Sequence, residues 1–181
     1  MPKKALEELT RELKAIEERW PGDSNDPIQR RIAIRSSFAA VESLAAAMMA
    51  TALPAISKMA VNSNLSGEDR TRMFFQVCAL SDLSYHVADS GQIKIQPART
   101  GLRNKALFAI NMLAKSNGVQ IVPREIEGWS HFKNAIELRN RITHPQNVDD
   151  LAVSQEEYDS AIKGLKWIVK CKHLACGGNN R

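Results

Sequence analysis

One run of residues carries the clearest chemical potential: Glu-Leu-Arg-Asn-Arg-Ile-Thr-His-Pro, at positions 137–145. On a helix that turns about 100° per residue, Arg139 lies within the apolar stripe that Phe132 and Ile136 define. An arginine on this inward face is costly unless it meets an anion or a carboxylate. The pattern therefore predicts a negatively charged partner for Arg139.

The end of the same helix adds a group that can transfer protons. Pro145 disfavours helical geometry at His144, so we expect the helix to end there and to turn the imidazole toward its mouth. Arg139 then lies near this histidine, beside the polar Asn140. An arginine stabilises charge on phosphoryl oxygens and a histidine moves a proton near neutral pH, so the pairing suits phosphodiester chemistry.

Two further pairs of charged residues bear on this site. Arg141 falls on the opposite face of the helix, four residues after Glu137, and we expect these two to form an ordinary surface pair. Arg35 and Glu42, seven residues apart, share one face of an earlier helix. Either they form partly buried ion pairs with other helices, or Glu42 faces Arg139 and fixes its guanidinium.

Other residues that could do chemistry have simpler explanations. Arg124 and His131 fit a looser arginine–histidine spacing, but Gly128 interrupts them and the pair spans a helix start. The run Cys-Lys-His-Leu-Ala-Cys at 171–176 crowds three soft ligands together and lacks a second half-site. We therefore expect no metal site and no cofactor.

Basic side chains are spread over two of the later helices. Most of them are expected to be solvated, but any that cluster beside the arginine and histidine would help to hold an RNA backbone. These side chains are Arg99, Arg103, Lys105, Lys163, Lys166 and Lys170. Tyr85 and His86, near the expected end of a helix, are interpreted as surface or packing residues.

The composition indicates one folded domain, over residues 1–181. Of the 181 residues, 44% are hydrophobic and 25% are charged, which excludes disorder as the main state. The formal charge of +5 permits an anionic partner without requiring one. Three cysteines do not indicate a secreted disulfide scaffold. Because no apolar core follows the basic N-terminal residues, we expect no signal peptide and a cytoplasmic location.

The hydrophobic periodicity predicts an all-α fold, an up-down bundle of about five to six helices. The first expected helix ends at Trp20, before Pro21-Gly22-Asp23. The next five run from Asp26-Pro27 to about Leu53, from a cap at Ser66 through Leu80 and on to Tyr85, from Leu102 to Ser116, from Glu127 to Thr143, and from a cap at Ser154 through Ile168. Residues 89–99 are expected to form a loop with a short extended piece at Ile93 and Ile95, and residues 173–181 a frayed tail.

The most apolar stretch, from Phe38 to Ile56, needs an environment that removes it from water. It carries Glu42 and meets Pro54 early, so a buried helix is a better interpretation than a membrane span. A helix that is apolar on all sides belongs at the centre of a bundle or at a subunit interface. We expect a small monomer to leave part of it uncovered, which predicts a twofold dimer.

The segment Arg139-Asn140-Arg141-Ile142-Thr143-His144 resembles the Arg-polar-x-x-x-His motif of the HEPN superfamily of small helical domains. The following Pro145, and a position before one last helix, are also similar to that family. The resemblance implies an HEPN-like helical bundle and a metal-independent endoribonuclease, often a toxin or a phage-defence effector. In the family mechanism the ribose 2'-hydroxyl attacks its own phosphate and leaves a cyclic phosphate and a 5'-hydroxyl end.

The resemblance also implies roles for particular residues. Arg139 would bind and stabilise the phosphate of RNA, His144 would act in proton transfer, and Asn140 would orient the histidine or the substrate. Two motifs from two chains would face each other across a homodimer, with an antitoxin or a nucleotidyltransferase as a possible further partner.

Two alternatives stay open at this point. Some HEPN domains are inactive binding modules, so the same fold could hold a nucleotide or a partner protein without cleaving anything. In the other alternative the protein is a helical regulator or adaptor, in which Arg139 pairs with Glu42 or another carboxylate and His144 caps a helix. The intact motif favours the enzyme.

Overall fold

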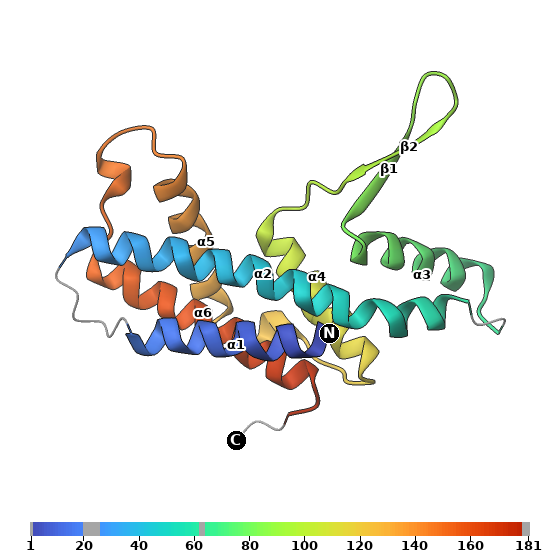
Figure 1. Ribbon diagram of the computed structural model, residues 1–181, viewed down its shortest axis with the longest axis horizontal. Coiled ribbons are helices and arrows are strands. Elements are labelled where there is room, and N and C mark those ends of the chain that lie inside the picture. Colours follow the sequence, from blue (N-terminus) through green and yellow to red (C-terminus); the bar gives the residue numbers. More distant parts are fainter. Residues whose placement is uncertain (1, 20–25, 62–63, 179–181) are drawn as a thin grey trace.

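The computed structural model describes residues 2–19, 26–61 and 64–178, which form a helical bundle with one projecting β-hairpin (Figure 1). The all-α prediction is confirmed for the body of the molecule. The elements are α1 (Pro2–Arg19), α2 (Pro27–Ala60), α3 (Gly67–Leu80), β1 (Leu83–Val87), β2 (Ile93–Pro97), α4 (Leu102–Ser116), α5 (Trp129–Thr143) and α6 (Gln155–Ala175), with short 3₁₀ turns η1 (Pro123–Glu125) and η2 (Asp149–Leu151).

Helix α2 is the central helix of the bundle and contacts each of the other five described α-helices. Its start follows the sequence, because the Asp26 side chain accepts a hydrogen bond from the Ile28 amide at 2.8 Å and Pro27 occupies the first turn. Its end differs from the predicted one, because the helix does not stop near Leu53 but continues through Pro54 to Ala60. Pro54 is exposed while Ala52 and Ile56 are buried, so packing of the inner face holds the helix together where one backbone hydrogen bond is missing.

The chain's own helices cover most of the apolar stretch in α2. Between residues 38 and 53 the exposed positions hold only alanine, serine and glutamate, namely Ala39, Glu42, Ser43, Ala46 and Ala50. The large side chains, such as Phe38, Leu44 and Met48, are fully buried within one chain. The part of this helix that one chain leaves exposed is thus a narrow face of small and polar side chains, and the twofold dimer expected there stays a prediction. By length and composition alone α2 could cross a membrane, with a mean hydropathy of 1.5 over its most apolar window.

Capping residues set the ends of several helices as expected. The Ser66 hydroxyl accepts from the Asp69 amide at 3.1 Å, and Ser154 and Glu157 form a reciprocal capping box at the start of α6. The expected end of the first helix, at Trp20 and Pro21-Gly22-Asp23, lies outside the described residues. The tail begins later than expected, since residues 173–175 still belong to α6.

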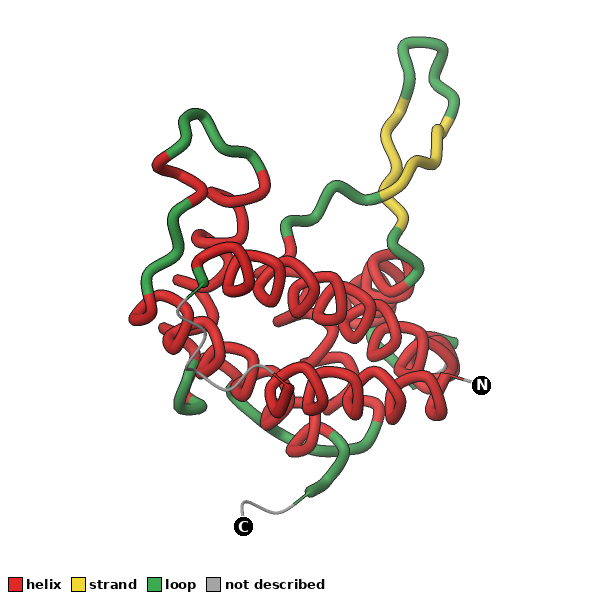
Figure 2. The backbone as a smooth tube through the Cα atoms, turned by 60° about the vertical axis from the view of Figure 1, so that its left-hand side comes forward, coloured by secondary structure: helices red, strands yellow, loops and turns green. Residues whose placement is uncertain are grey.

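The segment after α3 is a strand, so the extension of that helix to Tyr85 is wrong. Helix α3 ends at Leu80, and Asp82 has a positive φ of 57°, which turns the chain out of the helix. Apolar and polar residues then alternate with the two-residue period of a strand. β1 pairs antiparallel with β2, which confirms the extended piece at Ile93 and Ile95. Figure 2 shows this hairpin standing away from the helices.

Helix α5 is held against α6 by a cluster of three aromatic side chains, Trp129, Phe132 and Trp167. The Trp167 ring lies 4.6 Å from the Phe132 ring and 5.1 Å from the Trp129 ring, centre to centre. The two helices approach closely at Gly164, where a Cβ would stand 2.8 Å from the Cα of Phe132. This close packing fixes the helix that carries Arg139.

Candidate functional site: a groove beside the end of α5

A groove of about 430 Å³ lies between α5 and the first turn of α4, with part of α2 as its third wall. Three basic and two acidic side chains line it, so its formal charge is positive. The lining residues are Glu42, Gly101, Leu102, Arg103, Asn104, Lys133, Ile136, Glu137, Arg139 and Asn140. The structure thus brings three of the residues predicted from the sequence, Glu42, Arg139 and Asn140, into one groove.

Arg139 is held on the wall of this groove by two neighbours. Its Nη2 donates to Glu42 Oε1 at 2.7 Å, and its Nη1 donates to Asn140 Oδ1 at 3.2 Å. The arginine side chain is 27% exposed, so it borders the solvent-filled groove instead of the core. The predicted contact between Glu42 and Arg139 is confirmed. This contact is expected both if Glu42 positions Arg139 to bind a phosphate and if the pair only holds two helices together.

Glu42→Gln separates these two interpretations through stability. The Glu42 side chain is 47% exposed, and ion pairs that face water contribute only about 0.2–1 kcal/mol. We therefore expect this variant to lose less than about 1 kcal/mol in its free energy of unfolding, measured by urea denaturation. Glu68→Gln, in an exposed helical pair with Arg72, is the matched control. A loss above about 2 kcal/mol would mean that the Arg139–Glu42 pair is a structural tie.

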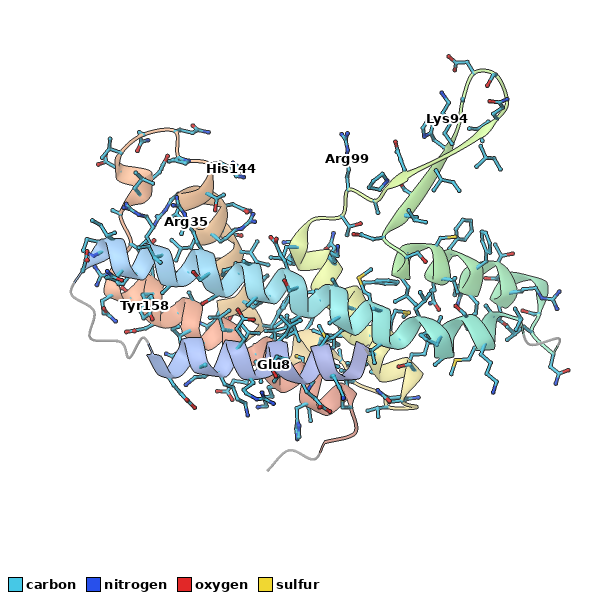
Figure 3. All side chains as sticks on the ribbon, in the orientation of Figure 1. Glu8, Arg35, Lys94, Arg99, His144 and Tyr158 are labelled. Atoms are coloured by element: carbon cyan, nitrogen blue, oxygen red, sulfur yellow. The ribbon has the colours of Figure 1, made fainter. Side chains whose placement is uncertain are left out.

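His144 lies one step beyond the groove, at the C-cap of α5. Its backbone amide donates to the Asn140 carbonyl at 3.0 Å, and its φ of −125° and ψ of 59° end the helix before Pro145, as expected. The imidazole is exposed and is not part of the groove lining. His144 comes five positions after Arg139, which corresponds to a rise of about 7.5 Å along a helix. Figure 3 shows His144 in the loop that rises above α2.

Arg35 of α2 holds the last turn of α5, a role that the sequence did not reveal. Its guanidinium donates to the Ile142 carbonyl, so the proposed ion pair of Arg35 with another helix is replaced by a helix-end contact. The Thr143 hydroxyl donates to the Arg139 carbonyl at 2.6 Å in the same turn. The Ile142 carbonyl is among the last four of the helix and lacks a partner within it, so Arg35 stabilises the end that carries His144.

Arg141 pairs with α6, and the prediction that it pairs with Glu137 is wrong. Its Nη2 lies 2.9 Å from Glu157 Oε1 and donates to the Ala152 carbonyl at 2.8 Å. The start of α6 brings a carboxylate closer than the one on its own helix. Partial burial alone would raise the pKa of Glu157, but hydrogen bonds from Arg141 and the Ser154 amide lower it below its ordinary value. Arg141 thus ties both ends of the loop that begins at His144.

The first turn of α4 adds backbone donors to the groove. Gly101 at the N-cap has no side chain to accept from them, so the amides of this turn keep their positive end free for an anion. Arg103 lies in the same turn, and Lys133 approaches from α5. The sequence pointed to Arg103 among six basic residues, but nothing in it paired the start of α4 with the end of α5.

The other basic residues do not cluster beside Arg139. Lys105 pairs with Asp82 at 2.6 Å, and Lys170 stands 4.0 Å from Glu127. Lys163 and Lys166 lie on exposed positions of α6, while Arg99 lies in the linker before α4 (Figure 3). Arg103 is therefore the member of the predicted set that lines the groove.

The alternative arginine–histidine pair does not form a site. Arg124, in η1, lies over the Trp129 ring, with its guanidinium carbon 5.9 Å from the ring centre. His131 Nδ1 lies 2.9 Å from the Ser160 hydroxyl on α6. The two side chains thus have separate partners.

The cysteine side chains in the run at the end of α6 lie in different environments. Cys171 is buried, and burial raises the pKa of its thiol to about 12, whereas Cys176 is exposed. Among residues 2–19, 26–61 and 64–178, no three histidine, cysteine or acidic side chains lie where they could hold one metal ion.

Comparisons with protein-family models, with curated proteins and with solved structures gave no match.

Proposed function

We propose that this protein is a metal-independent endoribonuclease of the HEPN type, acting in the cytoplasm as a toxin or a phage-defence effector. One observation carries the proposal: Glu42 and Asn140 hold Arg139 in an open groove, and the same helix ends at an exposed histidine. A guanidinium is planar, and one that is partly buried and held by its neighbours is suited to bind a phosphate with two parallel hydrogen bonds.

The proposed reaction needs little more than these two groups. The ribose 2'-oxygen forms a bond to the adjacent phosphorus, and the bond from phosphorus to the 5'-oxygen breaks. The 2'-hydroxyl loses a proton and the departing 5'-oxygen gains one. His144 serves one of these proton transfers, while Arg139 stabilises the charge that builds on the phosphoryl oxygens. The products are a cyclic phosphate and a 5'-hydroxyl end.

The groove also supports a path for the RNA backbone. Arg103, Lys133 and the free amides at the start of α4 present positive charge beside Arg139. A strand that follows this groove would place a phosphate near Arg139 and the next ribose toward His144. We propose that two such sites meet across a homodimer, and that an antitoxin or a nucleotidyltransferase controls the enzyme.

A second candidate function, a binding module that does not cleave, is favoured by a different observation. The Arg139 guanidinium already donates to two side chains, and His144 lies outside the groove. A groove of this kind holds a nucleotide through Arg103 and Lys133 without needing the histidine. The two functions differ in one respect that experiment reaches directly, which is whether RNA is cut.

The enzyme is expected to cut single-stranded RNA in the presence of EDTA. The measurement incubates the purified protein, free of any antitoxin, with a panel of end-labelled RNAs and asks for 5'-hydroxyl products that a polynucleotide kinase can phosphorylate. A substrate with 2'-deoxyribose at the cleavage site should resist, because it lacks the attacking oxygen. His86→Ala changes an exposed histidine on the hairpin and should cut like the wild type.

Two outcomes would contradict the proposal. If the protein leaves every RNA of the panel intact but still binds RNA or a nucleotide, its function would be that of a binding module. Cleavage that requires an added divalent metal would exclude the chemistry proposed for His144.

A further inference from the structure

The β-hairpin has one apolar face that the protein itself leaves uncovered. In its register Val87 pairs with Ile93 and Leu83 with Pro97, which puts apolar residues together on one face. The other face is polar, with Ser84 opposite Gln96 and His86 opposite Lys94. Ile93 and Ile95 are each 69% exposed and Val87 is 65% exposed. Such a face is ordinarily packed against a core.

Helix α3 extends this face with two exposed aromatic side chains. Phe74 is 58% exposed and Phe75 is 46% exposed, and their rings lie 6.0 Å apart. A depression of about 320 Å³ joins the helix to the strands and is lined by Phe74, Cys78, Leu83, Ser84, Ile93 and Ile95. We call the surface formed by Phe74, Phe75, Leu83, Val87, Ile93 and Ile95 the hairpin–α3 surface. It exposes on the order of 600 Å² of apolar area.

The hairpin needs this surface to be covered. A two-stranded hairpin is marginal by itself in water, and stability requires further strands or a packed face. All five residues of β2 are exposed, and the main contact of the hairpin with the helices is between β1 and α3, its neighbour in the chain. The strands therefore gain little from their own protomer.

The free strand edge favours a protein as the covering partner. β2 carries Lys94 and Pro97, two residues that discourage pairing at an edge, whereas β1 (Leu-Ser-Tyr-His-Val) has no lysine and no proline. The backbone groups on the outer edge of β1 therefore need either water or another strand as their hydrogen-bond partner. A lipid surface would cover the apolar face but would leave these donors and acceptors unsatisfied.

We propose that a second copy of this chain covers the hairpin–α3 surface. The surface contains no charged side chain, so a twofold axis brings two identical apolar faces together without opposing like charges. Its area approaches the roughly 800 Å² that each partner contributes to a standard interface. A twofold axis in the plane of the hairpin stacks the two apolar faces on each other, which places Ile93 and Ile95 in the contact and leaves the β1 edges open to water. The proposal does not rest on RNA cleavage.

Light scattering after gel filtration tests this interface. At tens of micromolar the wild-type protein should have twice the 20.1 kDa mass of one chain. Ile95→Lys should raise the dimer dissociation constant at least tenfold, because it places a charge in the dimer contact. Gln96→Lys adds the same charge one residue away on the polar face, where it should leave the dimer unchanged. Both positions are exposed in the protomer, so both variants should fold.

Other results would overturn the proposal. One is that the wild-type protein is a monomer at tens of micromolar. Another is that it is a dimer whose dissociation constant neither Ile95→Lys nor Phe74→Glu raises. A monomer that binds neutral lipid vesicles through Ile95 would assign the surface to a membrane. The nuclease test has a separate outcome. A monomer that cuts RNA would refute only the proposed interface. A dimer that leaves RNA intact would refute only the proposed enzyme.

Discussion

His144→Ala is expected to lower the rate of RNA cleavage by about two orders of magnitude or more while RNA binding changes by no more than a few-fold. The imidazole is exposed at the end of α5 and lies outside the groove lining, so its loss removes a proton-transfer group without emptying the groove. Arg139→Ala should lower binding and cleavage together, because its guanidinium is the group aimed at the phosphate. Arg139→Lys should restore little, since an ammonium cannot make two parallel hydrogen bonds.

The measurement combines single-turnover cleavage with equilibrium binding to an uncleavable 2'-deoxy analogue. Dimers that carry Arg139→Ala in one chain and His144→Ala in the other show whether the two chains share a site. A shared site would recover activity in a fraction of the mixed dimers. Near-wild-type cleavage by both single variants would mean that these residues are structural here, and the proposed reaction would fail.

Trp167→Ala is expected to lower the free energy of unfolding by about 3–5 kcal/mol, the range for removing a fully buried aromatic side chain. Only 1% of Trp167 is exposed, and its indole N–H donates to the Pro123 carbonyl at 3.0 Å. The substitution also removes the ring that packs against Phe132 on α5. Because small domains are stable by only about 5–15 kcal/mol, this is a large part of the total.

Urea denaturation followed by circular dichroism measures the loss without relying on tryptophan fluorescence. Trp167→Phe, which keeps a ring but loses the indole N–H, should cost less than the alanine variant. The two variants together separate ring packing from the hydrogen bond to Pro123. A loss below about 1 kcal/mol for Trp167→Ala would mean that the α5–α6 packing does not depend on this ring.

The sequence identified the features that depend on local chemistry. Ser154 with Glu157 and Asp26 with Pro27 cap helices through neighbours in the chain, and the structure has both caps. The contact between Glu42 and Arg139 was also within reach, because an arginine within the apolar stripe of a helix favours a carboxylate as its partner. RNA cleavage by these residues remains a prediction.

Features that depend on distant partners could not be predicted in the same way. Arg141 has a carboxylate four residues away, yet the start of α6 supplies a closer one, Glu157. Helix α2 passes Pro54 because buried residues on both sides outweigh one lost hydrogen bond. The sheet at Tyr85 follows from a turn at Asp82 that a helical period does not reveal. In the first two cases tertiary packing outweighs a sound local rule, whereas at Tyr85 one residue with a positive φ ends the helix.

The central position of α2 has a consequence for how the site could be switched on. Because α2 contacts all the other described α-helices, detaching any one of them exposes part of the common core, so the body opens as a cooperative unit. Activation by releasing a helix would therefore cost much of the total stability. Two segments project from the bundle, the loop after His144 and the hairpin arm (Figure 1). A regulator of this protein would act by holding or freeing these two segments, with the bundle as a rigid frame.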